Sequence, residues 1–152
     1  MPNTMRSLLR EGHGALQALG PDSPVADAVS LMNRRNIGAV LVMTPDEALL
    51  GIFTERDVLR RVLGQQLDPA DTSLGSVMTR EVFWIAPEAT TDQALALVAQ
   101  RNVRHLPVMD DQQVLGMISV RDLSTAVVRE RDMEVAALTS YLHGSYGGHV
   151  GG

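Results

Sequence analysis

Two short stretches of the chain place a hydroxyl group, an arginine and an aspartate in the same order. The first is GIFTERD, Gly51 to Asp57, and the second is GMISVRD, Gly116 to Asp122. Free N–H groups at the start of a helix attract phosphate oxygens, and the hydroxyl and the guanidinium add donors for the same anion. An ionised aspartate only accepts hydrogen bonds, which suits the paired hydroxyls of a ribose. The spacing therefore indicates two candidate sites for phosphate and sugar.

The same spacing also has a purely structural explanation. Thr54 and Asp57, like Ser119 and Asp122, stand at i and i+3 where an apolar run gives way to a helical pattern. This is the spacing of a capping box, in which side chains and backbone N–H groups at a helix start satisfy one another. Taken alone, such spacing is more often a cap than a ligand site. Retention of the hydroxyl, the arginine and the aspartate in both copies favours a function.

The two stretches lie inside a longer internal repeat. Pro21 to Met43 aligns with Pro87 to Met109, and both segments contain an Arg-Asn pair and end in Val-Met. A polar turn follows, one residue shorter in the second copy, after which LGIFTERD aligns with LGMISVRD. Self-similarity of this kind indicates that one structural unit is written twice.

Each unit has the hydrophobic pattern of a helix, a hairpin and a second helix. Apolar residues at i, i+3, i+4 and i+7 predict the first helix, and two β-prone runs around a polar turn predict the hairpin. A hairpin alone is not stable in water, so we expect the units to pack into one pseudo-twofold α/β (α+β) body. The expected elements are helices Val25–Arg35 and its counterpart from Thr90 or Thr91, strands Ala39–Met43 and Leu106–Met109, strands Leu49–Phe53 and Val114–Ile118, helices Glu55–Leu63 and Val120–Val128, and preceding strands Ala15–Leu19 and Val82–Ile85.

Local sequence gives further detail on the helices. Ser23 or Asp22 is expected to cap the first helix of the first unit, and Thr90 or Thr91 the first helix of the second unit. In the helix that follows GIFTERD, we expect Val58, Leu59 and Val62 to face the core. The segments SLLREGH and SVMTREV are predicted to form short helices, one ahead of each unit.

The C-terminal part of the chain is predicted to be a separate helix, Glu134 to His143, followed by a glycine-rich tail. Tyr141 and Tyr146 in this part are expected to contact a second copy of the chain. The whole chain then divides into residues 1–64 (first repeat with its N-terminal segment), 65–73 (linker), 74–130 (second repeat) and 131–152 (C-terminal helix and tail).

Composition narrows the class of function. The net charge of -5 argues against a nucleic-acid partner, which usually faces a basic surface. The chain has no cysteine, which excludes disulfides and thiol nucleophiles and suits a reducing compartment. No apolar run reaches the length of a membrane span, so we expect a cytoplasmic protein that does not contact membranes. We expect no metal site, and no set of residues suggests an enzyme.

The repeated unit resembles the cystathionine-β-synthase (CBS) domain, and the chain resembles a stand-alone CBS pair, or Bateman module. The resemblance rests on GIFTERD and GMISVRD, on RNIGAVLV and RNVRHLPV, and on SVMTREVFWIAPEAT between the copies, and it covers Met5 to Arg129. It implies two β-α-β-β-α repeats with two clefts between them. It also implies that the module forms homodimers.

The same resemblance implies what the clefts bind: AMP, ADP, ATP, a nicotinamide dinucleotide (NAD or NADH) or S-adenosylmethionine, with no other cofactor required. The implied nucleotide-binding residues are Thr54, Arg56 and Asp57 with Ile37, Gly38 and Ala39 for the first cleft, and Ser119, Arg121 and Asp122 with Val103, Arg104, His105 and Pro107 for the second.

The two clefts are expected to differ, because Arg104 and His105 stand where the first copy has Gly38 and Ala39. We therefore expect the second cleft to bind more tightly or to favour more phosphates. Trp84 is expected in the wall of the second cleft or at a dimer surface. The function that the sequence favours is a nucleotide sensor that signals to a partner protein. The alternative is a structural or adaptor dimer that binds no ligand.

Overall fold

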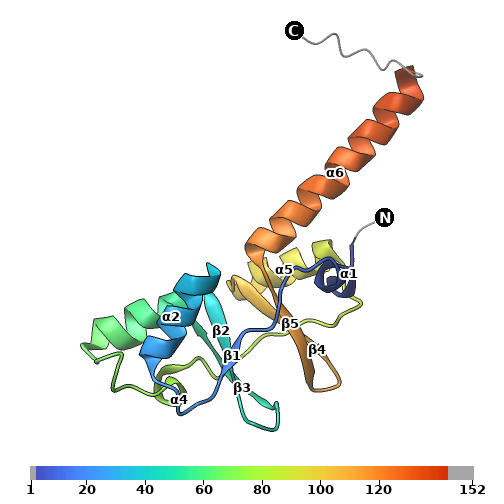
Figure 1. Ribbon diagram of the computed structural model, residues 1–152. Coiled ribbons are helices and arrows are strands. Elements are labelled where there is room, and N and C mark those ends of the chain that lie inside the picture. The colour runs from blue at the N-terminus through green and yellow to red at the C-terminus, as the bar shows by residue number, and fades with distance from the viewer. Residues whose placement is uncertain (1–2, 144–152) are drawn as a thin grey trace.

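The computed structural model describes residues 3–143 of the chain, as two small sheets side by side with helices around them (Figure 1). The elements in chain order are α1 (Met5–Arg10), β1 (Ala18–Leu19), α2 (Val25–Arg35), β2 (Ala39–Met43), β3 (Leu49–Thr54), α3 (Glu55–Asp57), η1 (Val58–Val62), η2 (Leu63–Gln65), α4 (Leu74–Val77), α5 (Thr91–Arg101), β4 (His105–Asp110), β5 (Gln113–Ser119) and α6 (Val120–His143).

The first unit is built on the sheet β1-β2-β3. β2 is its central strand, parallel to β1 and antiparallel to β3, and all five of its residues are buried. One face of β2 packs on α2, as Val40 and Val42 join Val25 and Phe53 in one cluster. The predicted helix and both hairpin strands are confirmed, and the expected strand from Ala15 shrinks to β1.

The second unit has only the two-stranded sheet β4-β5. The strand expected at 82–85 is wrong, because only Ile85 pairs, through a single parallel bridge to Val108. Two features end the pairing there: Val82 and Phe83 turn towards the cavity described below, and Pro87 follows two residues later. The core of this unit includes Leu106, Ile118 and Leu123.

The two sheets pack against each other through their other faces. Leu41 and Ile52 of the first unit lie in one buried cluster with Val114 and Met117 of the second. This shared core confirms the expectation that the repeats form one body.

The two short helices are exchanged between the units: α1 precedes the first unit but packs on the second, and α4 precedes the second unit but packs on the first. α1 contributes Met5 and Leu8 to the core of the second unit, whereas α4 contributes Leu74 and Val77 to the core of the first. Each unit is therefore completed by the short helix that precedes the other unit in sequence. The helix predicted over SVMTREV ends at Val77, because Thr79 leaves it and pairs with Ile52 of β3.

This exchange also explains how α2 starts. The predicted side-chain cap by Ser23 or Asp22 is wrong, because the N-cap is Pro24 and no side chain caps it. Instead, the backbone carbonyls of Thr72 and Pro69 accept the first N–H groups of the helix, at 2.8 and 3.0 Å. In the second unit a side-chain cap is confirmed, and of the two expected residues, Thr90 and Thr91, it is Thr90 that caps the helix.

The helix after β3 is irregular. α3 covers three residues, and the chain continues as a π-helix, η1, and a 3₁₀ turn, η2. The i→i+5 bonding of a π-helix changes which side chains share a face. Val62 is buried and Val58 partly so, but Leu59 is 65% exposed, so the prediction that Leu59 faces the core is wrong.

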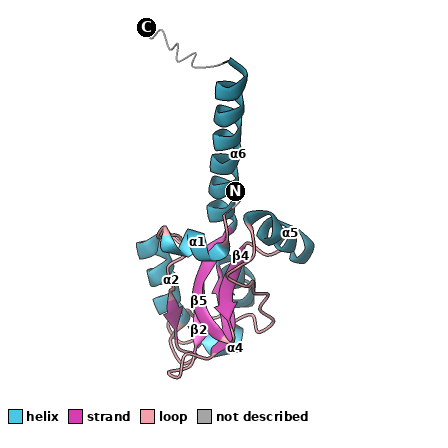
Figure 2. Cartoon of the chain, turned by 90° about the vertical axis from the view of Figure 1, so that its right-hand side faces the viewer, coloured by secondary structure: helices cyan, strands magenta, loops and turns pink. Residues whose placement is uncertain are grey.

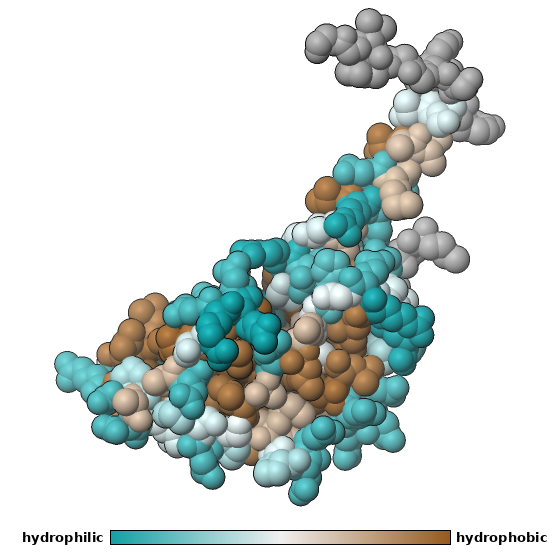
Figure 3. All heavy atoms as spheres, viewed as in Figure 1, coloured by the Kyte–Doolittle hydropathy of each residue, from teal (hydrophilic) through white to brown (hydrophobic). Residues whose placement is uncertain are grey.

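The counterpart in the second unit, α6, is one continuous helix of 24 residues. The two separate helices predicted here are joined, because no glycine or proline interrupts 120–143. Leu123 and Val127 are buried, but beyond Glu130 the helix projects into solvent (Figures 1 and 2), with apolar side chains along it (Figure 3). Tyr146 and the side chain of Tyr141 lie outside the described part of the chain. Among the described residues, no helix is long and apolar enough to cross a bilayer.

Candidate functional site

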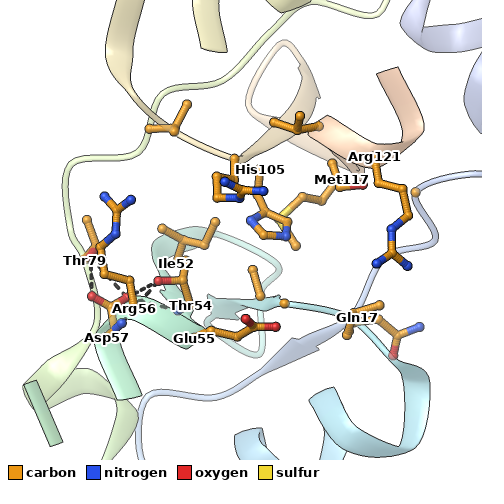
Figure 4. A pocket seen from close by; sticks show the side chains of 18 of the residues that line it. Gln17, Ile52, Thr54, Glu55, Arg56, Asp57, Thr79, His105, Met117 and Arg121 are labelled. Atoms are coloured by element: carbon orange, nitrogen blue, oxygen red, sulfur yellow. Dashed lines mark hydrogen bonds between the residues drawn. The ribbon is translucent and has the colours of Figure 1, made fainter. Parts of the chain in front are cut away.

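A cavity of about 840 Å³ lies between the two units and is lined by both (Figure 4). The two expected clefts are joined in this one space. The predicted site residues that line it are Ile37, Gly38, Ala39, Thr54, Arg56, Asp57, Val103, Arg104, His105, Ser119, Arg121 and Asp122. Their role in binding stays a prediction, but the fold brings them together.

Pro107 is the predicted site residue that the fold does not place in the cavity lining. It is buried in β4, where Met117 of β5 stands opposite it in register. Its carbonyl accepts the N–H of Ile85, so this part of the strand is covered by the chain itself. Met117 lines the cavity instead.

The first repeated motif forms the predicted capping box. The N–H and hydroxyl of Thr54 donate to Oδ2 of Asp57, at 3.0 and 3.2 Å, and the N–H of Asp57 donates back to the Thr54 hydroxyl. One more hydrogen bond and an ion pair reach this carboxylate. The hydroxyl of Thr79 lies 3.0 Å from Oδ1, and Nε of Arg61 lies 3.4 Å from the same oxygen. The side chain of Asp57 is left only 7% exposed.

The second motif has the same internal bonds and fewer external ones. The N–H and hydroxyl of Ser119 each lie 2.9 Å from Oδ2 of Asp122. Oδ1 accepts no hydrogen bond from the described residues, and Nδ1 of His13, at 3.7 Å, is too far for one. The side chain of Asp122 is 24% exposed. One oxygen of this cavity-lining carboxylate is thus open, in that it accepts no hydrogen bond from the described residues.

The difference arises from the segments that pass beside each motif. The N–H of Ile52 in β3 donates to the carbonyl of Thr79, and the N–H of Met117 in β5 donates to the carbonyl of Gly14. By this bond, Gly14 occupies in the second unit the place of Thr79 in the first. It carries no hydroxyl for Asp122. A sequence comparison of the repeats alone misses both residues, because Thr79 follows its motif in sequence whereas Gly14 lies far ahead of its own.

Glu55 and His105, from different repeats, both lie beside Gly38 in the cavity lining. A Cβ on Gly38 would lie 2.9 Å from the Glu55 carboxylate and 3.2 Å from the His105 ring. Burial lowers the pKa of His105 below its usual value of 6.5, and Arg104 adds to this effect, while Glu55 and Asp122 oppose it. The neutral imidazole is therefore favoured at this position.

Four arginines line the cavity with their side chains exposed: Arg35, Arg56, Arg104 and Arg121. None of them makes an ion pair within the described chain, so their guanidinium groups are available to an anionic ligand.

The wall of the cavity includes residues that the sequence does not single out, among them Gln17, Glu81 and Phe83. Arg101 lies over the ring of Phe83, with its guanidinium carbon 4.8 Å from the ring centre. Trp84, predicted for the wall or a dimer surface, is outside the lining and 54% exposed. No group of three or more potential metal ligands occurs within residues 3–143.

Comparisons with known proteins agree with this architecture. The family model for the CBS domain matches residues 15–64 and 74–129. The chain is 36% identical over 148 residues to the CBS domain-containing protein CBSX3, mitochondrial, of Arabidopsis thaliana, with 95% of this chain and 72% of that protein covered.

Two solved structures show the same fold. The crystal structure of the CBS domain protein NE2398 is 39% identical, with a TM-score of 0.78 over 84% of this chain and 99% of that one. The CBS domain pair of protein MJ0100 was solved in complex with 5′-methylthioadenosine and S-adenosyl-L-methionine. It is 20% identical, with a TM-score of 0.71 over 81% of this chain and 98% of that one, and at this identity the likeness concerns the fold alone.

Proposed function

The chain belongs to the CBS domain family as a pair of repeats, and from this premise we propose that it is a regulatory module that binds an adenine nucleotide in the cavity between the repeats. The ligand classes that we propose are AMP, ADP, ATP, NAD or NADH, and S-adenosylmethionine. The module passes its ligand state to a partner protein.

The observation that carries this proposal is the open carboxylate oxygen of Asp122 beside an arginine-lined cavity. A carboxylate held by Ser119 at the start of a long helix can accept the hydroxyls of a ribose. Arg104 and Arg121 lie in the same cavity for the phosphates. A pair of helix caps needs neither the open oxygen nor the unpaired guanidinium groups.

A solved relative of the fold supports the same ligand class. The CBS pair of MJ0100 was crystallised with two adenosine compounds, 5′-methylthioadenosine and S-adenosyl-L-methionine. A fold of this kind therefore accommodates an adenosine group. For the present chain, the residues around Asp122 supply the chemistry that such a group requires.

We further propose that the module works as a homodimer and that α6 carries part of the contact. Val128, Val135 and Leu138 are exposed and lie on one side of this helix, because their spacing of seven and three residues follows the helical repeat. Pairing with a second copy would remove these side chains from water. The alternative function, a structural or adaptor dimer without ligand, keeps this contact but leaves the cavity without a role.

Thermal unfolding with a panel of ligands separates the two functions. We expect AMP, ADP, ATP, NAD, NADH or S-adenosylmethionine at saturating concentration to raise the Tm, with GTP and ribose 5-phosphate as controls for the base. A ligand present at about 100 times its Kd stabilises the folded state by about 2.7 kcal/mol. For a chain of this size each kcal/mol corresponds to roughly 2–4 °C. If no adenine compound shifts the Tm, the nucleotide-sensor proposal fails and the adaptor function leads.

A further inference from the structure

We infer that the cavity has a single ribose site, at Asp122 in the second repeat, and that Asp57 in the first repeat is a structural clamp closed to ligands. The inference rests on the proposed function, because it assigns nucleotide binding to one half of the cavity. It departs from the expectation of two working sites, which the repeated motif alone suggests.

The carboxylate of Asp57 is already occupied by protein donors. A carboxylate offers about four lone-pair positions to hydrogen-bond donors. Oδ2 accepts the N–H and the hydroxyl of Thr54, and Oδ1 faces the hydroxyl of Thr79 and Nε of Arg61. A ribose would have to displace Thr79 and Arg61 from a side chain that is almost fully buried.

The carboxylate of Asp122 has the opposite arrangement. Its Oδ2 is held by Ser119, which fixes the side chain, and its Oδ1 has no donor within hydrogen-bond distance in the described residues. The side chain is 24% exposed, and Asp122 lines the cavity. A sugar hydroxyl can therefore bind there without breaking an existing hydrogen bond.

The backbone keeps the second site open. A Cβ on Gly14 would lie 2.7 Å both from the Met117 carbonyl oxygen and from Cδ1 of Ile118. The φ of Gly14 is also +69°, a conformation that other residues rarely adopt. No side chain can stand at Gly14 to reach Asp122 as Thr79 reaches Asp57. The asymmetry is thus part of the fold and does not depend on a side-chain rotamer.

The charged side chains next to the two motifs also favour ligand binding in the half of the cavity that the second repeat forms. Glu55 follows the hydroxyl in the first motif, and it lines the cavity beside Gly38 and His105. Val120 takes this position in the second motif, with Arg104 and Arg121 in the lining of the same half. An anionic phosphate is repelled by a nearby carboxylate and attracted by a guanidinium.

The clamp at Asp57 has a structural role of its own. It ties Thr79, which leads from α4 into the second repeat, to the start of α3. Arg61 adds a second tie, because it forms an ion pair with Asp57 and donates a hydrogen bond to the carbonyl of Met78, at 3.0 Å. Asp57 thereby fixes the segment after α4, Met78 and Thr79, against the first repeat.

Titration calorimetry tests this assignment with matched variants. The wild type is titrated with AMP, ATP and S-adenosylmethionine, and the tightest of these is used for Asp122→Asn and Asp57→Asn. We expect one ligand per chain for the wild type. Because a hydrogen bond to a charged group is lost, Asp122→Asn should weaken binding about tenfold or more. Asp57→Asn should keep the wild-type Kd and lower the Tm.

A second pair of variants covers the case in which Asp57→Asn does not fold. Ser119→Ala and Thr54→Ala remove the same hydroxyl from the two motifs, and only Ser119→Ala should weaken binding. Two ligands per wild-type chain, or equal losses of affinity from the two members of either pair, would overturn the single-site assignment while the proposed function stands. Absence of binding to the wild type would instead overturn the proposed function.

Discussion

The hydroxyl of Thr79 lies 3.0 Å from Oδ1 of Asp57, although 22 residues separate the two in sequence. This contact links the segment after α4 to the first turn after β3. The sequence motif suggests that Asp57 binds a ligand, but this contact gives its carboxylate a structural role instead. The equivalent aspartate, Asp122, lacks such a partner within the described chain.

Replacement of Thr79 by valine should therefore destabilise the protein. The change removes a hydrogen bond to a buried carboxylate, and bonds of this kind contribute about 1.5–3 kcal/mol. Urea denaturation should show a loss of this order in the free energy of unfolding. Thr125→Val, at an exposed position of α6, is the matched control and should change it by less than about 0.5 kcal/mol. Equal effects of the two variants would show that the contact has no energetic weight.

Gly14→Ala should destabilise the fold, and Gly20→Ala should not. At Gly14 the added methyl group meets Met117 and Ile118, and the backbone has a positive φ. At Gly20 a Cβ meets nothing within 4 Å, and the φ is unstrained. Thermal unfolding of the two variants compares them directly. A similar Tm for both would contradict the close passage of the N-terminal segment over β5.

Arg104→Ala should weaken the binding of ATP more than that of AMP. Arg104 lines the cavity without an ion-pair partner among the described residues, so it can meet the additional phosphates. We expect about a tenfold larger loss for ATP, measured by titration calorimetry at fixed salt. Arg129→Ala, at an exposed site outside the cavity lining, should leave both affinities unchanged. Equal losses for the two nucleotides would exclude Arg104 as a selector of phosphate number.

Stability should depend on the protonation of His105. Burial lowers the pKa of this residue below 6.5 in the folded state, so the unfolded state binds its proton first as the pH falls. The neutral ring therefore contributes stability that is complete well above pH 6.5 and is lost as the pH falls through and below this value. The slope for one group is at most about 1.4 kcal/mol per pH unit.

The measurement compares the free energy of unfolding of the wild type and His105→Gln at pH 7.5, 6.5 and 5.5. The glutamine variant should lose less stability than the wild type between the first and the last pH. If the free energy of unfolding of both proteins changes equally with pH, His105 is not the group responsible for the pH dependence.

Replacement of Val135 and Leu138 by glutamine should dissociate the proposed dimer. Both side chains are exposed on the part of α6 that projects from the body, so the fold of a single chain does not need them. Light scattering should give the mass of a dimer for the wild type and of a monomer for the double variant. The Met133→Gln control changes an exposed residue on another side of the helix and should keep the dimer. An unchanged mass in the double variant would place the contact elsewhere.

The sequence pattern predicted the duplicated unit, both hairpins and both capping boxes, because each depends on residues close together in the chain. It could not predict the closure of Asp57, since the hydroxyl that closes it comes from Thr79, outside the repeated motif. The cap of α2 failed for the same reason, as the helix is started by carbonyls of Thr72 and Pro69. The exposed position of Leu59 follows from a π-helix, which a pattern of regular helical spacing does not reveal.

α6 joins the proposed ligand site to a distant part of the molecule. Asp122 lies in its first turn, and the helix runs on for 24 residues in all, about 36 Å at 1.5 Å per residue. A tilt of about 5° at the cavity would move the far end by roughly 3 Å on this geometry. A reorientation small enough to preserve the hydrogen bonds of Ser119 would thus produce a larger displacement at the C-terminal end of α6. A partner protein bound at that end could respond to this displacement.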